Sequence, residues 1–266
     1  MSTMDEATYY RDHWVEIDPE RLDAYEQMFE WRPQNAPLLE PAELAPGQVV
    51  VDYGCGPGGL AVELARRVAP TGQVHGVDLN PLFLERAAAR AKRDGVESLI
   101  RWHRTDGDKI PLASAFADRL VCKNVMEYVP DVAATLGEFR RVLKPGGLAH
   151  VIDSDWGLLA VEPIGAERMA ELFAAAAPAY RTPLIGRKLR GAMLAAGFRD
   201  VKVKVLATAD TKGFTAPIVF NMLGYARESG RLSERTREAL VRDLKQSLAD
   251  GTFLLILPQF LVTGSA

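Results

Sequence analysis

Short apolar runs alternate with longer segments of helical periodicity from about residue 49 to residue 205. An apolar run of this length fits a buried strand, and apolar residues three and four positions apart fit one face of a helix. Strands that alternate with helices in this way are typical of a parallel sheet with crossover helices in an α/β fold. The predicted strands are Val49–Tyr53, Gln73–Val77, Leu99–His103, Arg119–Lys123, Leu148–Asp153 and Val201–Thr208.

Two helical segments lie outside this alternation. Residues 6–43 precede the first strand and are rich in aromatic side chains, and residues 214–249 follow the sixth strand. In the later segment Ser233 is a plausible N-cap, and Leu240, Leu244 and Leu248 form one apolar stripe. A final strand, Thr252–Thr263, is interrupted by Pro258. We therefore expect an N-terminal helical segment over residues 1–46 and a core over residues 47–266, with a helical insertion at 214–250.

A glycine-dense turn follows the first predicted strand. The strand ends in Asp52, and Gly54, Gly56, Gly58 and Gly59 follow before the next helix. Glycine permits a positive φ and a close approach to a ligand, and the helix start offers free N–H groups and the positive end of a dipole. The turn also matches the G-x-G-x-x-G spacing of dinucleotide-binding folds, which alone is weak evidence. A carboxylate before the first glycine would repel a pyrophosphate and attract a cationic amino group.

Three further features accompany this turn. Asp78 ends the second strand and is followed by Asn80-Pro81, which predicts a helix cap and a first-turn proline. Asp106-Gly107 ends the third strand segment, and Leu143-Lys144-Pro145-Gly146-Gly147 closes a later helix. From about Val49 to Asp153 the chain thus resembles a class I S-adenosylmethionine-dependent methyltransferase, of the small-molecule branch that includes the ubiquinone and menaquinone methyltransferases.

This resemblance implies a Rossmann-like, seven-stranded, mostly parallel sheet with an antiparallel last strand and helices on both faces. It also implies that the N-terminal and late helical segments form a lid. By resemblance Asp52 attracts the amino group of S-adenosylmethionine, Asp78 accepts both ribose hydroxyls, and Asp106 accepts from the adenine amino group. The implied cofactor residues are Asp52, Gly54, Gly56, Gly58, Asp78, Leu79, Asp106, Gly107 and Asn124. Each aspartate or glycine by itself also fits an ordinary turn or helix cap.

Methyl transfer to a hydroxyl, an amine or an acidic carbon benefits from a general base. Candidates are His13 in the N-terminal segment, Glu127 after the fourth strand, and Asp155 or Asp153 after the fifth. Many members of the resembled family carry histidine where this chain has Tyr128, so a histidine base at that position is excluded. A lone histidine is more often structural, and Glu127 and Tyr128 also fit packing or capping roles.

Several aromatic residues are candidates to enclose an apolar or aromatic acceptor. The same residues fit the alternative that helices dock their aromatic stripes on the core, and a lid can do both. The substrate candidates are Tyr10, Trp14, Tyr128, Trp156 and Phe220.

Composition narrows the classes of partner. The 266 residues carry a formal net charge of −3 with acids and bases interspersed, which gives no basic face for nucleic acid and no polybasic run for a membrane. Cys55 and Cys122 form neither a disulfide framework nor a metal-ligand spacing, so we expect no metal. The first six residues lack a signal-peptide pattern. We expect a cytoplasmic monomer or homodimer that acts on a small molecule.

Three functions remain open from the sequence. The leading hypothesis is a methyltransferase that acts on a specialised metabolite or a quinone-like compound. The second is a protein of the same fold that binds S-adenosylmethionine without transferring the methyl group. The third is a nicotinamide-dependent oxidoreductase, which the G-x-G-x-x-G spacing suggests and which Asp52, Asp106 and the absence of a Tyr-x-x-x-Lys pair disfavour.

Overall fold

The computed structural model describes residues 5–17, 19–28, 30–107 and 109–266. Parts of the predicted N-terminal segment, residues 1–4, 18 and 29, lie outside the described residues. The strands are β1 (Val49–Tyr53), β2 (Gln73–Asp78), β3 (Ile100–Arg104), β4 (Ala117–Lys123), β5 (Leu143–Ser154), β6 (Ala160–Glu162), β7 (Arg199–Leu206), β8 (Leu254–Ile256) and β9 (Gln259–Ser265). The α-helices are α1 (Tyr9–Val15), α2 (Pro19–Met28), α3 (Gly59–Val68), α4 (Pro81–Arg93), α5 (Val132–Val142), α6 (Gly165–Ala176), α7 (Ile185–Ala195), α8 (Ala216–Ser229) and α9 (Glu234–Asp250). Short 3₁₀ helices are η1 (Pro33–Leu38), η2 (Glu40–Ala42), η3 (Glu97–Leu99), η4 (Trp156–Leu158) and η5 (Ala177–Ala179).

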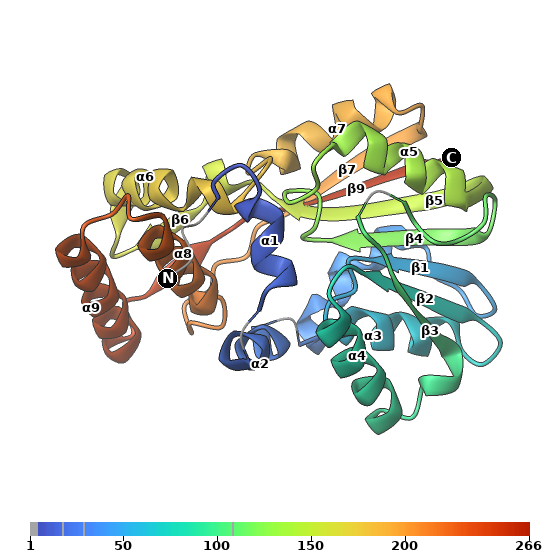
Figure 1. The fold of residues 1–266 in the computed structure, drawn as a ribbon, viewed down its shortest axis with the longest axis horizontal. Helices are drawn as coiled ribbons and strands as arrows, with labels where there is room; N and C mark the ends of the chain where they lie inside the picture. The colour runs from blue at the N-terminus through green and yellow to red at the C-terminus, as the bar shows by residue number, and fades with distance from the viewer. Residues whose placement is uncertain (1–4, 18, 29, 108) are drawn as a thin grey trace.

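A seven-stranded sheet forms the centre of the fold, in the order β3-β2-β1-β4-β5-β9-β7 (Figure 1). The strands β1 to β5 pair in parallel, whereas β9 runs antiparallel between β5 and β7. The expected Rossmann-like sheet with an antiparallel last strand is therefore confirmed. Each of the six predicted earlier strands overlaps an observed one, and β5 begins earlier than predicted because the turn at 144–147 belongs to it.

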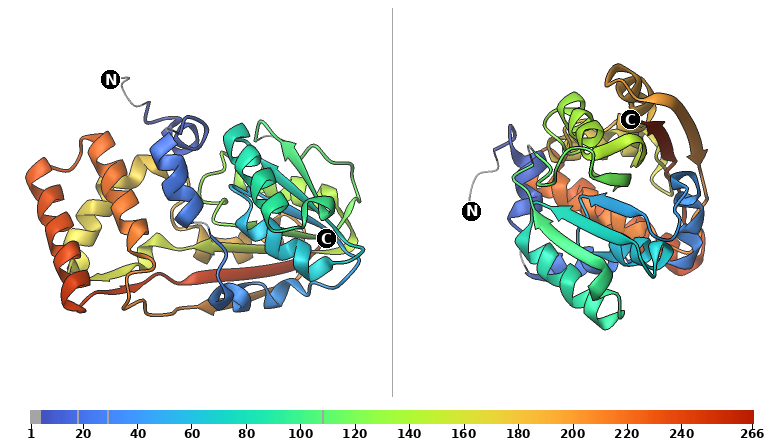
Figure 2. Two further views of the ribbon diagram at one scale, coloured as in Figure 1. Left: turned by 90° about the horizontal axis from the view of Figure 1, so that it is seen from below. Right: turned by 90° about the vertical axis from the view of Figure 1, so that its right-hand side faces the viewer.

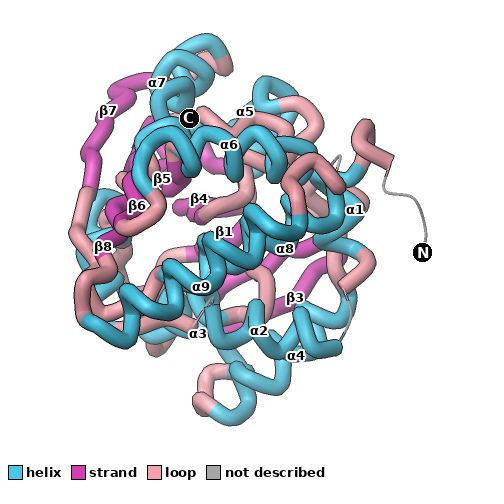
Figure 3. The backbone as a smooth tube through the Cα atoms, turned by 90° about the vertical axis from the view of Figure 1, so that its left-hand side faces the viewer, coloured by secondary structure: helices cyan, strands magenta, loops and turns pink. Residues whose placement is uncertain are grey.

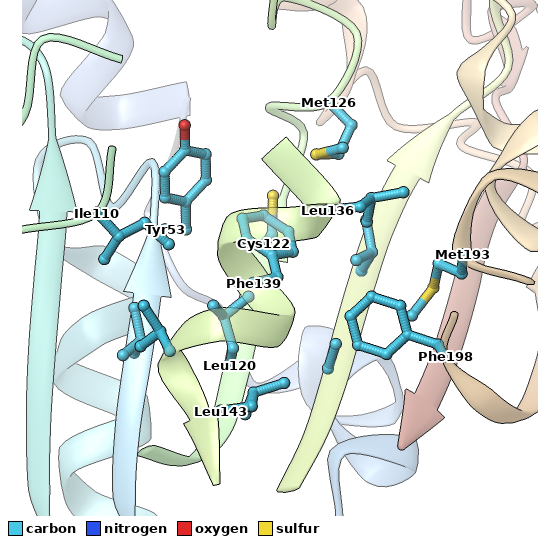
Figure 4. Packing of buried hydrophobic residues seen from close by; sticks show 14 of the residues in the cluster. Tyr53, Ile110, Leu120, Cys122, Met126, Leu136, Phe139, Leu143, Met193 and Phe198 are labelled. Atoms are coloured by element: carbon cyan, nitrogen blue, oxygen red, sulfur yellow. The ribbon is translucent and has the colours of Figure 1, made fainter. Parts of the chain in front are cut away.

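The two faces of the sheet bury alternate residues of the central strands β1 and β4. Val51 and Tyr53 of β1 pack in a cluster with Leu120, Cys122 and the α5 residue Phe139 (Figure 4). Val50 of β1 and Val121 of β4 point to the opposite face and pack in a second cluster with residues of α3. Since α5 and α7 cover the first face and α3 and α4 the second, helices lie on both faces as expected.

A helical lobe lies at one end of the sheet, where α6, α8 and α9 pack around a cluster that includes Leu172, Leu223 and Leu244 (Figure 2). Ser233 caps α9 through a hydrogen bond from the Thr236 N–H, as predicted. We expected the core alternation to continue through residues 160–180. Instead β6, α6 and η5 join the lobe, because β6 pairs with β8 in a separate two-stranded sheet.

The last predicted strand is divided in two. Pro258 separates β8 from β9, and proline has no N–H to donate to a strand ladder. Consequently β8 contributes to the lobe, while β9 fills the place between β5 and β7 in the main sheet. The chain thus crosses between lobe and core within two residues.

The N-terminal helices lie between the lobe and the ends of the parallel strands (Figure 1). Seen from the lobe end, α8 and α9 lie in front of the strands (Figure 3). The ring of His13 in α1 lies 5.0 Å from that of Tyr225 in α8. On the other side, the Asn80 side chain at the start of α4 donates a 2.8 Å hydrogen bond to the Trp14 carbonyl. Asn80 also accepts from the Leu82 and Phe83 N–H groups, so the predicted cap doubles as a tether for α1.

Candidate functional site

The glycine turn after β1 has the backbone geometry that only glycine adopts readily. Gly54 and Gly56 have φ values of 71° and 51°. A Cβ on Gly54 would lie 2.3 Å from a methyl carbon of Val125, whereas a Cβ on Gly56 would meet nothing within 4 Å. Gly54 is therefore required by packing against the loop after β4, and Gly56 leaves open space beside the turn.

Gly58 has a different role from its neighbours. It is the N-cap of α3 with φ 82°, and a Cβ there would lie 2.7 Å from the Ala87 Cβ in α4. Its lack of a side chain lets α3 and α4 approach closely beneath the turn. Gly58 does not line the cavity that its neighbours enclose, whereas Gly59 does.

The carboxylate of Asp78 at the end of β2 ties the turn to the next helix. One of its oxygens accepts from the Gly56 N–H at 2.8 Å, and the other accepts from the Asn80 N–H at 2.9 Å. Burial raises the pKa of Asp78, and these N–H donors oppose that rise. Asp78 lines the cavity together with Leu79.

Asp52 is fully buried at the end of β1, and neither of its carboxylate oxygens has a hydrogen-bond partner. Burial raises the pKa of Asp52 to about 8, repulsion from Asp78 adds to the rise, and the positive charge of Lys123 opposes it. A buried acid without donors is costly to ionise. The side chain is therefore suited to a cationic partner that arrives from the cavity.

The ends of β3 and β4 supply the remaining expected cofactor residues. Asp106 and Gly107 line the cavity, and the Gly107 N–H donates to the Thr105 hydroxyl at 3.1 Å. Asn124 has φ 55°, and its N–H donates to the Ile152 carbonyl at 2.8 Å. Its side-chain oxygen is buried without a partner, so it offers an acceptor on the cavity wall.

The structure thus gathers all the expected cofactor residues except Gly58 around one cavity of about 180 Å³ at the carboxyl ends of the strands. In open α/β sheets this edge is where ligands bind. The N-terminal segment and the loop after β4 close the other side with largely apolar side chains. They are Trp14, Met28, Trp31, Val125, Tyr128 and Val129.

Lys123, the last residue of β4, also lines this cavity and was not among the predicted site residues. Burial lowers the pKa of its ammonium, while Asp153, Glu127 and Asp52 raise it. The sequence contained a signal: a lysine that directly follows the apolar run Leu120–Cys122 at the ligand-binding edge of the sheet is not an ordinary surface charge.

His13 lies inside an aromatic cluster and does not line the cavity. Its ring centroid is 4.9 Å from Trp14, 5.0 Å from Tyr225 and 5.7 Å from Tyr128. One ring nitrogen contacts the Tyr9 carbonyl, and the other is buried without a partner. Burial lowers the pKa of His13 to about 4, so the imidazole is neutral near pH 7.

Glu127 is buried and receives a hydrogen bond from the indole N–H of Trp156. Its carbonyl accepts from the Arg181 and Thr182 N–H groups, each at 2.9 Å. Burial, with repulsion from Asp153, raises the pKa of Glu127 well above its usual range. Glu127 therefore joins the loop after β4 to the segment before α7, away from the cavity lining.

Asp155 is held by Arg187. The Arg187 side chain donates to both of its oxygens, at 2.5 and 2.7 Å. Asp155 also caps η4 by accepting from the Gly157 N–H at 3.1 Å. This two-point pairing occupies the carboxylate, and Asp155 does not line the cavity. Its role as a base stays a prediction without a supporting contact.

The five expected substrate residues fall into two groups. Trp14 and Tyr128 line the cavity, and their rings meet edge to face with centroids 5.0 Å apart. Trp156 and Phe220 pack in or against the apolar cluster of the lobe. Tyr10 lies outside the cavity with the Arg181 guanidinium 5.5 Å from its ring centre.

Clusters of metal ligands and membrane-spanning helices are both absent from the described ranges. Among these residues no group of three or more His, Cys, Asp or Glu side chains is placed to hold a metal ion. In the same part of the chain, no helix is long and apolar enough to cross a membrane.

Comparison with known proteins points to one family. Residues 50–147 match the family model described as "Methyltransferase domain". A 2-phytyl-1,4-naphtoquinone methyltransferase of Trichormus variabilis is 38% identical over 108 residues, which are 41% of this chain and 47% of that protein. The chain therefore spans about half the length of the curated relatives it matches first.

Solved structures share the fold. Phosphoethanolamine N-methyltransferase 2 of Haemonchus contortus, solved with S-adenosyl-L-methionine, has a TM-score of 0.65 at 20% identity, over 96% of this chain and 59% of that one. The cyclase SpnF has a TM-score of 0.59 at 18% identity, over 95% of this chain and 85% of that one. Because the match to the family model covers β1 to β4 and the loops at their carboxyl ends, residues 50–147 carry a methyltransferase domain, and the chain is similar in sequence to the quinone methyltransferases.

Proposed function

We propose that this protein transfers the methyl group of S-adenosylmethionine to a small, apolar or aromatic molecule. The observation that carries the proposal is the composition of one cavity. Asp52, Asp78 and Asp106 from three strand ends share it with the aromatic side chains of Trp14 and Tyr128. Such a cavity offers polar contacts for a charged cofactor on one side and an apolar wall for an acceptor on the other.

The residues of the cavity fit the cofactor. The two oxygens of Asp52 without partners suit the ammonium group, and the carboxylate of Asp78 suits the ribose hydroxyls. The open space beside Gly56 admits the ligand close to the backbone, and the unpartnered Asn124 oxygen offers a further acceptor. By resemblance Asp106 accepts from the adenine amino group.

The protein's contribution to the reaction is positioning and exclusion of water. S-adenosylmethionine supplies an activated methyl group, which is displaced in line by the acceptor atom. Holding the two partners in this geometry, in a closed and largely apolar space, provides much of the rate enhancement. The N-terminal segment closes the space through Trp14, Met28 and Trp31.

No candidate base reaches the cavity lining: His13, Glu127 and Asp155 all lie outside it. This arrangement favours an acceptor that is already nucleophilic, such as an amine, an enolate or a phenolate. It also motivates the second candidate function, binding of S-adenosylmethionine without methyl transfer. Release of S-adenosylhomocysteine in the presence of an acceptor panel separates the two functions, since only the first consumes the methyl group.

The first test is thermal unfolding with S-adenosylhomocysteine, and separately with NAD and NADP. A ligand at about 100 times its Kd stabilises the folded state by roughly 2.7 kcal/mol. For a chain of this length we expect the unfolding midpoint to rise by about 5–10 °C with S-adenosylhomocysteine alone.

Asp78→Ala should abolish this shift because the ribose contacts are lost, whereas Asp250→Ala at the exposed end of α9 should retain it. A shift only with a nicotinamide cofactor would contradict the methyltransferase and restore the oxidoreductase hypothesis.

We also propose a cellular compartment, a class of partner and an oligomeric state. Cys55 and Cys122 are both free and buried, which fits a reducing compartment such as the cytoplasm. The interspersed charges that give no basic face support a small-molecule partner over a nucleic acid. A monomer or a homodimer is consistent with this reading, and light scattering of the purified protein distinguishes them.

A further inference from the structure

Lys123 lies on the same face of the sheet as Asp52. Val50 and Val121 pack on the α3 face, and Cys122 packs on the α5 face. Because side chains alternate along a strand, Asp52 and Lys123 follow Val50 and Val121 onto the α3 face. The parallel register pairs Asp52 with Val121, so Lys123 is one step further toward the ligand-binding edge.

Three carboxyl groups act electrostatically on Lys123, and two of them are already occupied. Asp153 accepts from the Met126 and Ser154 N–H groups, at 2.9 and 2.8 Å. Glu127 accepts from the Trp156 indole. The third, Asp52, has no partner on either oxygen. Lys123 and Asp52 are thus a basic and an acidic side chain that line one cavity without a hydrogen bond between them.

A ligand that carries both charges completes this arrangement. The amino-acid end of S-adenosylmethionine bears an ammonium and a carboxylate on one carbon. If Asp52 takes the ammonium, the carboxylate requires a cation nearby. Arg11 is the other basic residue of the cavity lining, but it contacts Asp12 and its side chain is 46% exposed. Lys123 is on the inner wall, beside Asp52.

We propose that Lys123 binds the carboxylate of the cofactor's amino-acid end, so that Asp52 and Lys123 together recognise a zwitterion. The inference rests on the proposed function, since it assigns a subsite of the same cavity. It makes the protein selective for cofactors that retain the carboxylate. It also explains why a lysine occupies the end of a strand whose other side chains are mostly apolar.

Three ligands that share the thioadenosine part and differ at the amino-acid end test the proposal by calorimetry. S-adenosylhomocysteine has both groups, S-adenosyl-3-thiopropylamine has only the amine, and 5′-methylthioadenosine has neither. Lys123→Gln should weaken S-adenosylhomocysteine binding about 10- to 100-fold, the range for a charge-assisted hydrogen bond. Binding of the other two ligands should not weaken, because they have no carboxylate. Lys123→Arg should restore much of the S-adenosylhomocysteine affinity.

Matched variants make the outcomes distinct. Asp52→Asn should weaken both amine-bearing ligands and spare 5′-methylthioadenosine, and Lys202→Gln on β7 should change nothing. An equal loss of all three ligands in Lys123→Gln, or no loss, would overturn the proposal. If Arg11→Gln, and not Lys123→Gln, weakens S-adenosylhomocysteine binding selectively, the contact with the ligand carboxylate belongs to Arg11. If the native protein binds none of the three, the proposed function itself fails.

Discussion

Asp52 is subject to opposite requirements from stability and from ligand binding. Its pKa is raised to about 8 by burial and by Asp78, so the folded state holds its proton more tightly than the unfolded chain does. The stability that this proton contributes is fully present below about pH 4 and is lost as pH rises toward about 8. Without a ligand, ionised Asp52 therefore destabilises the folded protein.

We expect Asp52→Asn to raise the unfolding midpoint of the ligand-free protein, by about 2–6 °C at pH 8 and by less at pH 5. The reason is that asparagine carries no charge to bury. Unfolding followed by circular dichroism between pH 5 and 9 measures the effect.

Asp118→Asn is a control variant for which we expect the opposite change in unfolding midpoint. Hydrogen bonds from Lys144 and from the Val49 N–H hold the pKa of Asp118 below its usual value, so its stabilising contribution is present at neutral pH and is lost on acidification. Removing that charge should lower the midpoint at pH 7. A difference in midpoint between Asp52→Asn and the native protein that stays the same from pH 5 to pH 9 would contradict the buried, unpartnered state of Asp52.

At the scale of elements, the packing of α3 against α4 depends on one glycine. Gly58 combines a φ of 82° with a virtual Cβ only 2.9 Å from the Ala87 Cα. Since backbone cannot move aside as a flexible side chain can, an alanine there requires the two helices to separate. The glycine turn and the helix start would move with them.

Gly58→Ala should therefore lower the unfolding midpoint by about 3–8 °C, corresponding to a loss of roughly 1–2 kcal/mol. Gly137→Ala is the matched control, because Gly137 is exposed in α5 with no atom within 4 Å of a virtual Cβ. There alanine should stabilise the helix by about 0.5–1 kcal/mol. Calorimetry measures the unfolding midpoints of both variants. A Gly58→Ala midpoint equal to that of the native protein would contradict the close packing of α3 against α4 at this glycine.

For the whole molecule, the cavity couples the N-terminal segment to the core. Trp14 and Met28 line it from α1 and α2, and Asp78 and Asn124 line it from the sheet. Asn80 joins the two sides through its bond to the Trp14 carbonyl. A ligand that contacts both sides restricts the separation of the segment from the core.

We predict that S-adenosylhomocysteine slows amide hydrogen exchange in α1 and α2 at least several-fold, since local opening then requires loss of ligand contacts. Exchange in α9, which lies at the far side of the lobe, should be unchanged and serves as the internal reference (Figure 2). Mass spectrometry of peptic peptides resolves these segments. Protection confined to the glycine turn would show that the N-terminal segment is not a lid.

Sequence pattern was sufficient for the parallel strands and for the loops that meet at their carboxyl ends, whereas the antiparallel last strand followed from the family resemblance. Short continuous apolar runs mark the strands, and the acids and glycines at their ends are local signals in the sequence. The caps of α4 and α9 at Asn80 and Ser233 were also predictable, because a cap bonds within three residues of itself.

Only the tertiary structure decided the strand pairings and side-chain contacts that no local sequence pattern indicates. Long-range pairing placed β6 with β8 and so moved residues 160–180 into the lobe. It buried His13 against rings from the loop after β4 and from α8, and it paired Asp155 with Arg187. It also brought Lys123 beside Asp52. These contacts join residues far apart in the chain, so burial and charge pairing fix them only once the sheet has formed.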